Sequence, residues 1–126
     1  MKIDHIAVAS NSIEDSDRFF TELLGLKKIK TFSVSAELME KFFRINKEFV
    51  FVRYQNDNLG VEVIITNDNS KSIDNFTHSC LIVDNRDEFV NISSSMGYTT
   101  IKVPRKESEG YFLFVKDSFG NLYEVK

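Results

Sequence analysis

The sequence predicts an α+β protein built from two copies of one βαβββ unit, and a duplicated pair of side chains is the first observation behind this prediction. Each half begins with a strand pattern that carries one of the two histidines, His5 or His78. Each half also ends with a strand pattern that carries a glutamate, Glu62 or Glu124. Two imidazoles and two carboxylates repeated in this way are the ligands that a divalent metal ion on a pseudo-twofold axis would need.

The spacing of the two halves is the second observation. The histidines are 78 − 5 = 73 residues apart, and the glycines that end the two predicted helices, Gly25 and Gly97, are 97 − 25 = 72 residues apart. These two spacings differ by only one residue, which indicates an internal duplication. We therefore predict one domain with three parts. These are unit one at residues 1–67, a polar linker at 68–75 and unit two at 76–126.

The elements of the first unit follow from local patterns. Residues 2–9 alternate as a β-branched strand that places His5 on the same face as Ala7. Ser12 is suited to cap a helix, whose apolar residues recur at helical spacing until Gly25. Three further strands are expected at residues 28–34, 49–54 and 60–66.

The second unit repeats this order. Residues 76–83 have the pattern of a strand, Asn85 is a candidate helix N-cap, and Gly97 suits the end of the helix. Three more strands are predicted at residues 99–103, 111–116 and 122–125.

Residues 35–43 break the symmetry, because they have the propensities of a short helix and no counterpart in the second unit. The favoured interpretation is a packed connector between strands. The alternative is a wall or lid over a pocket, with Met39, Phe42 or Phe43 facing a ligand.

Composition narrows the class of protein. The 126 residues are 42% hydrophobic and 28% charged, as in ordinary soluble domains. The net charge of −3, without a lysine- or arginine-rich block, argues against nucleic acid or a membrane surface as the partner. We expect neither a secretion signal nor a membrane span, because the sequence begins with a strand pattern and has no apolar stretch long enough to cross a bilayer. A lone cysteine, Cys80, fits a reducing compartment, so we expect a soluble cytoplasmic protein.

Four motifs resemble those of the vicinal oxygen chelate superfamily, which includes glyoxalase I, bleomycin-resistance proteins, fosfomycin-resistance enzymes and extradiol dioxygenases. They are Asp4–Val8, Phe19–Leu26, Thr77–Leu81 and Asp117–Val125. In this order and spacing they are specific for the fold, and the resemblance covers essentially the whole chain. It implies two βαβββ units that form a concave, open, glyoxalase-like barrel, and commonly a homodimer.

The resemblance implies metal ligands on the first and last strands of each unit, which here are His5, Glu62, His78 and Glu124. All four positions hold a competent ligand, a pattern that is most similar to glyoxalase I. A single histidine on a strand is more often structural, but four coincident positions outweigh that interpretation. Zn²⁺, Ni²⁺, Co²⁺, Fe²⁺ and Mn²⁺ all accept such a mixed ligand shell, and the identity of the metal ion stays open.

Four protein ligands would leave room at the ion for water or for two oxygens of a small-molecule substrate. Chelation would polarise a carbonyl group and acidify the adjacent C–H bond. A carboxylate that loosens from the metal would then remove the proton. The resemblance gives this catalytic role to Glu124 or Glu62, and the sequence does not choose between them. We therefore predict a metal-dependent lyase or isomerase similar to glyoxalase I (lactoylglutathione lyase).

Other residues around the predicted site have two interpretations. Arg53, Lys102, Arg105 and Lys106 could hold a substrate anion, although exposed charges are the default expectation for all four. Cys80 shares a strand face with His78 and could approach the pocket, although a small buried thiol is the favoured interpretation.

Differences from glyoxalase I argue against glutathione as a cosubstrate. Val8, Ala9 and Ser10 occupy the stretch where glutathione-dependent relatives usually carry an arginine, and Phe20 replaces a common tyrosine. The helical insert at 35–43 is also atypical of that subgroup.

Two alternative functions stay open. One is a metal-dependent transferase that modifies an antibiotic such as fosfomycin, against which Glu62 counts because those relatives lack a glutamate ligand in the first unit. The other is a metal-free ligand-binding protein of the bleomycin-resistance type, which the 12 phenylalanines permit. An extradiol dioxygenase is disfavoured because that class usually has a longer chain.

Overall fold

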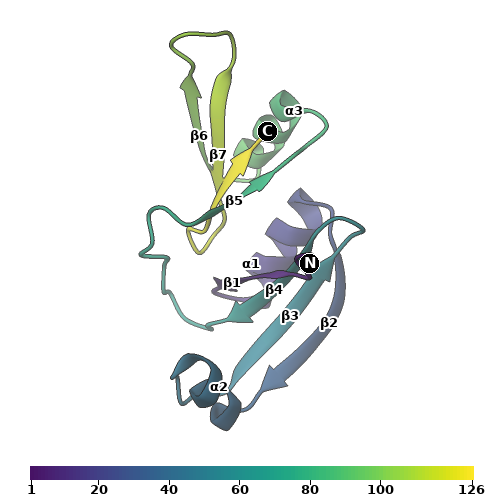
Figure 1. Ribbon diagram of the computed structural model, residues 1–126, viewed down its shortest axis with the longest axis vertical. Helices are drawn as coiled ribbons and strands as arrows, with labels where there is room; N and C mark the ends of the chain where they lie inside the picture. Colours follow the sequence, from purple (N-terminus) through teal and green to yellow (C-terminus); the bar gives the residue numbers. More distant parts are fainter. The chain divides into compact units, whose positions relative to one another are not determined.

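The computed structural model describes residues 1–126 and divides them into two compact units, Met1–Ser70 and Lys71–Lys126 (Figure 1). The boundary falls inside the predicted polar linker. The first unit contains β1 (Ile6–Ser10), α1 (Ile13–Ser16), the π-helical segment η1 (Asp17–Leu23), β2 (Lys27–Val34), α2 (Ala36–Phe43), β3 (Phe49–Gln55) and β4 (Gly60–Ile65).

The first unit folds into one four-stranded sheet with the strand order β1-β4-β3-β2. β1 runs parallel to β4, whereas β4, β3 and β2 are antiparallel neighbours. One face of this sheet is apolar and buried, with Val52, Tyr54, Val61 and Val63 all almost inaccessible to solvent. The alternate residues of each strand lie on the other face of the sheet. That face carries polar side chains and a second apolar cluster.

The helical segment α1–η1 covers the apolar face of the first sheet. Ser12 caps its start by accepting a hydrogen bond from the backbone N–H of Asp15 at 3.0 Å, which confirms the predicted cap. The ring of Phe20 stacks on Tyr54 with 5.3 Å between centroids. Gly25 adopts a φ of +72°, the left-handed conformation that lets the chain leave the helix for β2.

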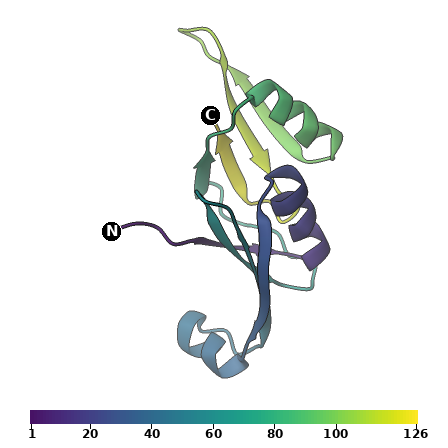
Figure 2. The same cartoon turned by 90° about the vertical axis from the view of Figure 1, so that its right-hand side faces the viewer.

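The insert between β2 and β3 is the helix α2, visible beyond one end of these strands in Figure 2. Ser35 caps it, and Met39 is buried in a cluster with Val34 and Phe51. The favoured prediction of a packed connector agrees with this contact. Phe42 and Phe43 instead remain exposed.

The second unit repeats the arrangement of the first without the insert. Its sheet has the order β5-β8-β7-β6, with β5 parallel to β8 and the other neighbours antiparallel. Asn85 caps its helix by accepting the backbone N–H of Glu88 at 3.0 Å. The elements are β5 (His78–Leu81), α3 (Arg86–Ser95), β6 (Thr99–Pro104), β7 (Tyr111–Lys116) and β8 (Leu122–Val125).

The predicted α+β class and the two βαβββ units are confirmed by this topology. The first strand of each unit is shorter than expected, because β1 begins at Ile6 and β5 spans only His78–Leu81. No helix has the length and apolar character needed to cross a lipid bilayer.

Candidate metal centre

His5 and Glu62 meet on the first sheet because of the register between β1 and β4. Ala7 is the ladder partner of Glu62, and His5 lies two residues earlier, so both side chains lie on the same face. The Nε2 atom of His5 is 3.7 Å from Oε1 of Glu62. The register between the two strands therefore brings His5 and Glu62 into a pair on one face of the sheet.

His78 and Glu124 form the equivalent pair in the second unit. Cys80 is the ladder partner of Glu124, and His78 again lies two residues earlier. The Nε2 atom of His78 is 3.7 Å from Oε2 of Glu124, the same separation as in the first unit. The duplication thus extends from the backbone to the two side chains.

The other ring nitrogen of each histidine has an acceptor as its partner. Nδ1 of His5 lies 2.9 Å from Oδ2 of Asp4, and Nδ1 of His78 lies 2.8 Å from the carbonyl oxygen of Phe76. A carboxylate and a carbonyl only accept, so Nδ1 carries the hydrogen in both rings. Hydrogen bonds to His5 and Arg53 lower the pKa of Asp4, which keeps this carboxyl ionised as an acceptor. In its neutral form, each imidazole would then present the lone pair of Nε2 toward a glutamate oxygen.

A nitrogen lone pair that faces a carboxylate oxygen suits a shared cation. Imidazole nitrogen and carboxylate oxygen bind Zn²⁺ at about 2.0–2.2 Å, so two donors on one ion lie no more than about 4.3 Å apart. Both 3.7 Å separations fall within this limit. Second partners on Nδ1 are also typical of histidines that bind metal through Nε2.

Each unit supplies only one such pair. Neither unit by itself gathers three or more histidine, cysteine, aspartate or glutamate side chains into a ligating cluster.

A turn before β8 fixes the chain that leads to Glu124. Oδ1 of Asp117 accepts the backbone N–H groups of residues 119–121 at 2.9–3.0 Å. Its Oδ2 accepts hydrogen bonds from Nδ2 of Asn121 at 2.8 Å and from the hydroxyl of Tyr123 at 3.2 Å. Burial raises the pKa of Asp117, while these hydrogen bonds act in the opposite direction. The turn around Asp117 therefore has a structural role next to Glu124, which is a predicted metal ligand and one of the two candidate bases.

Arg53 differs from its expected state as an exposed charge, because its accessible fraction is only 7%. Its Nη1 lies 3.3 Å from Oε2 of Glu62, and its Nη2 lies 3.1 Å from Oδ2 of Asp4. The ladder between β3 and β4, in which Arg53 pairs with Glu62, explains the burial. The sequence alone did not reveal this contact or the role of Asp4 as the partner of His5. The adjacency of Asp4 and His5 in the chain was the available signal.

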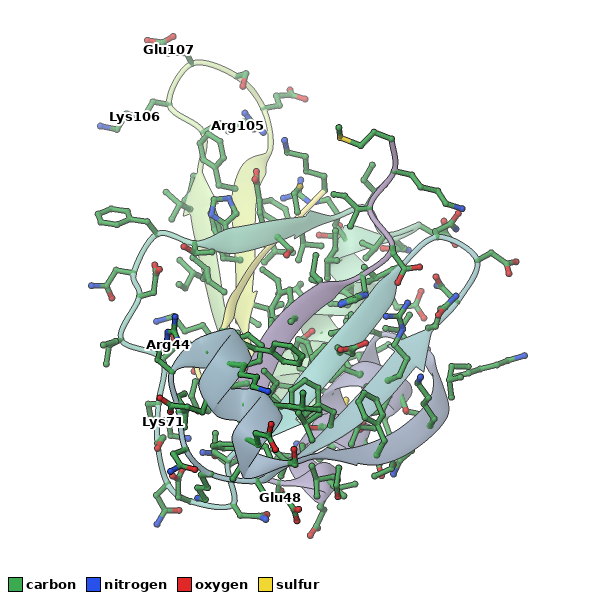
Figure 3. The ribbon with its side chains drawn as sticks, turned by 60° about the horizontal axis from the view of Figure 1, so that its bottom comes forward. Arg44, Glu48, Lys71, Arg105, Lys106 and Glu107 are labelled. Carbon is green, nitrogen blue, oxygen red and sulfur yellow. The ribbon has the colours of Figure 1, made fainter.

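The other predicted cations remain exposed, as expected. Lys102 lies over the ring of Tyr111 at 4.0 Å, and Arg105 lies over the ring of Phe112 at 4.2 Å. Figure 3 shows Lys106 pointing outward from the loop between β6 and β7. Lys102 and Arg105 therefore each make a cation–π contact with an aromatic ring of their own hairpin.

The prediction of a buried thiol at Cys80 is wrong, because this cysteine is free and exposed. It lies on the face of β5 that carries His78, as the two-residue period of a strand requires. That face is not covered by the helix of its unit, which explains the exposure of the thiol.

Comparisons with solved structures agree with this fold. A glyoxalase family protein from Enterococcus faecalis has a TM-score of 0.71 at 15% identity, over 98% of this chain and 95% of that chain. The fosfomycin resistance protein FosX from Listeria monocytogenes has a TM-score of 0.72 at 13% identity, over 99% and 91%. A mutant of that FosX, complexed with Mn(II) and 1S,2S-dihydroxypropylphosphonic acid, has a TM-score of 0.70 at 14% identity, over 98% and 87%.

These similarities confirm the glyoxalase-like fold. A search of curated proteins found no match to the sequence. The model of the family described as "Glyoxalase/Bleomycin resistance protein/Dioxygenase superfamily" matches residues 4–114, which include three of the four predicted ligand positions. The chain therefore belongs to the glyoxalase/bleomycin resistance protein/dioxygenase superfamily, the vicinal oxygen chelate superfamily.

Proposed function

We propose that the protein is a divalent-metal enzyme that chelates a small oxygenated substrate and catalyses proton transfer, as a lyase or isomerase of the glyoxalase I type. The observation that carries this proposal is the repeated pairing of a histidine Nε2 with a glutamate oxygen at 3.7 Å in both units. Two copies of one donor pair are the set that a single Zn²⁺, Ni²⁺, Co²⁺, Fe²⁺ or Mn²⁺ ion accepts.

The proposed metal ligands are His5, Glu62, His78 and Glu124. Two carboxylates would balance the charge of the ion, which lowers the cost of holding it away from bulk water. The hydrogen bonds on Nδ1 of each histidine would orient the rings with Nε2 toward the ion. When bound, the ion would polarise a substrate carbonyl and acidify the neighbouring C–H bond.

The chain itself would supply the proton acceptor. Glu62 and Glu124 are both carboxylates with partly accessible side chains, so either could take a proton from a bound substrate. We also propose a homodimer as the functional form, because members of this superfamily are commonly homodimers. The two units of one site would then come from one chain or from two.

The sheet faces that carry the pairs favour a substrate with an apolar group. In the first unit, Phe32, Phe49 and Ile64 pack with the buried cluster around Phe51, on the face that carries Glu62. In the second unit, the ring of Phe114 lies edge-on to His78 with 5.8 Å between centroids. Apolar surface beside the donors would exclude water from the reacting bond and bind the hydrocarbon part of the substrate.

A second candidate is metal-dependent modification of fosfomycin, which the structural similarity to FosX favours. A phosphonate requires a cation that is free to bind it. The guanidinium of Arg53 is already engaged by three other residues, Asp4, Gln55 and Glu62. We therefore place this candidate second. A metal-free binding protein of the bleomycin-resistance type is the third.

Metal analysis followed by turnover measurements tests these proposals. The leading proposal predicts one divalent ion per site in purified protein, and loss of that ion in His5→Ala and in Glu124→Gln. It also predicts turnover of a methylglyoxal–thiol hemithioacetal by at least one metal form. Turnover of fosfomycin alone would support the second candidate. Ligand binding without any metal ion would contradict both enzymes and support the binding protein.

A further inference from the structure

The two histidine–glutamate pairs differ in the residue that faces each glutamate from the neighbouring strand. Arg53 is the ladder partner of Glu62 between β3 and β4. Phe114 is the ladder partner of Glu124 between β7 and β8. Directly paired residues project from the same face of a sheet, so one carboxylate faces a guanidinium and the other a phenyl ring. The surroundings of Glu62 can therefore be compared directly with those of Glu124 at the equivalent position of the second unit.

The guanidinium of Arg53 is held from three sides. Nη1 lies 3.3 Å from Oε2 of Glu62, and Nε lies 3.3 Å from Oε1 of Gln55. Nη2 donates to the carbonyl oxygen of Asp4 at 3.2 Å and to its Oδ2 at 3.1 Å. Each of the three nitrogens is thus engaged within the unit. Arg53 acts on Glu62 and not on a substrate anion.

Gly60 makes room for this arrangement. A Cβ atom at Gly60 would lie 2.7 Å from the carbonyl oxygen of Asp4 and 2.8 Å from Nη2 of Arg53. Gly60 pairs with Gln55, whereas the equivalent ladder position in the second unit pairs Leu122 with Lys116. Gly60 and Arg53 therefore both differ from the residues at the equivalent positions of the second unit. This is expected if the glycine is there to accommodate the arginine.

Glu124 has no comparable cation in its unit. Nζ of Lys126 lies 3.6 Å from its Oε1, but the lysine side chain is 61% exposed. Water and salt screen such a contact. The side chain of Arg53, by contrast, is only 9% exposed beside Glu62.

We propose that Arg53, bound to Oε2 of Glu62, weakens this carboxylate as a ligand for the metal ion, which would bind Oε1. This inference rests on the proposed metal centre. Oε1 is the oxygen that lies 3.7 Å from Nε2 of His5. A guanidinium and a divalent cation that share one carboxylate repel each other and compete for its charge. Glu62 is therefore the weaker carboxylate ligand, and Glu124 the stronger one.

A double-mutant cycle followed by the visible absorption of bound Co²⁺ tests this inference. The proteins are the wild type, Arg53→Met, Glu62→Gln and the double variant. Arg53→Met should bind Co²⁺ about tenfold more tightly, because the competing cation is gone. In the Glu62→Gln background the same change should alter the affinity less than about twofold.

Lys30→Met is the matched control. Lys30 is the ladder partner of Arg53 on β2, but its ammonium lies over the ring of Phe32 and not on Glu62. Its removal should change Co²⁺ affinity less than about twofold, because exposed charges are screened. An equal gain in Lys30→Met would mean that net charge, and not the contact with Glu62, sets the affinity, and would overturn the inference.

Phe114→Arg tests the same inference without disturbing the buried arginine. A guanidinium opposite Glu124 should weaken Co²⁺ binding about tenfold. Unchanged affinity in Phe114→Arg, or unchanged or weaker binding in folded Arg53→Met, would overturn the role of Arg53. A purely structural role would give that weaker binding. If the wild type binds no Co²⁺, the proposed metal centre itself is wrong and this inference falls with it.

Discussion

The buried hydroxyl of Tyr123 donates a hydrogen bond to Oδ2 of Asp117, 3.2 Å away. Tyr123 directly precedes Glu124, so this bond ties the strand that carries a proposed ligand to the turn that precedes it. Burial raises the pKa of Tyr123 well above its ordinary value, so the phenol stays a donor at any physiological pH. The hydrogen bond between Tyr123 and Asp117 therefore stabilises strand β8 without involving the proposed metal ion.

Removing this donor should weaken the fold. We expect Tyr123→Phe to lower the free energy of unfolding by about 1–2 kcal/mol, because the buried carboxylate of Asp117 loses one of its hydrogen bonds. Urea denaturation of the metal-free protein measures the change. A free energy equal to that of the wild type would mean that the hydrogen bond contributes nothing.

The packing of α2 gives a second prediction. Met39 is 1% exposed and lies against Val34 and Phe51, so Met39→Ala should cost about 2–4 kcal/mol through the cavity it leaves. Phe42 is 63% exposed, and Phe42→Ala should change stability by less than about 0.5 kcal/mol. Chemical denaturation compares the two. Equal losses would contradict the assignment of Met39 as the anchor of the insert.

Gly60→Ala should destabilise the metal-free protein by about 1–3 kcal/mol, because the added Cβ would lie within 2.8 Å of existing atoms. Part of this cost comes from Nη2 of Arg53. The penalty should therefore be smaller when the substitution is made in an Arg53→Met background. Thermal or urea unfolding of the four proteins measures it, and equal penalties in both backgrounds would show that the guanidinium is not what occupies the space.

The lowered pKa of Asp74 should make the stability of the fold depend on pH in the acidic range. Hydrogen bonds from the backbone N–H groups of Thr77 and Phe76 lower its pKa below 3.8, since they favour the ionised carboxylate. A lowered pKa in the folded state adds stability above the unfolded value, and this stability is lost as the pH falls through the lowered value. Between about pH 6 and about pH 3 the wild type should therefore lose more stability than Asp74→Asn. An identical loss in both proteins would exclude this contribution.

Local patterns in the sequence were sufficient to predict most of the fold. The caps at Ser12 and Asn85 and the glycine at position 25 depend on neighbouring residues alone, and the structure has them as expected. The four candidate ligands came from the repeated motifs and from the resemblance to the superfamily, and the sequence did not predict which histidine lies beside which glutamate. The register between strands then brought each pair to 3.7 Å.

What the sequence did not reveal depends on contacts between distant segments. Arg53 is buried because Asp4, 49 residues earlier, and Glu62 both bind its guanidinium, and no local pattern encodes that. Cys80 is exposed because its strand face has no helix over it, although a cysteine on an apolar strand is usually buried. Comparison of the two halves offered one signal, since Gly60 and Arg53 replace Leu122 and Phe114 at equivalent positions.

Anomalous diffraction from crystals grown with Co²⁺ tests the central claim most directly. We predict one peak at about 2.0–2.2 Å from Nε2 of His5, from Nε2 of His78 and from an oxygen of each of Glu62 and Glu124, whether the two pairs come from one chain or from two. A peak bound to a single histidine–glutamate pair, or no peak at all, would contradict the proposed metal centre.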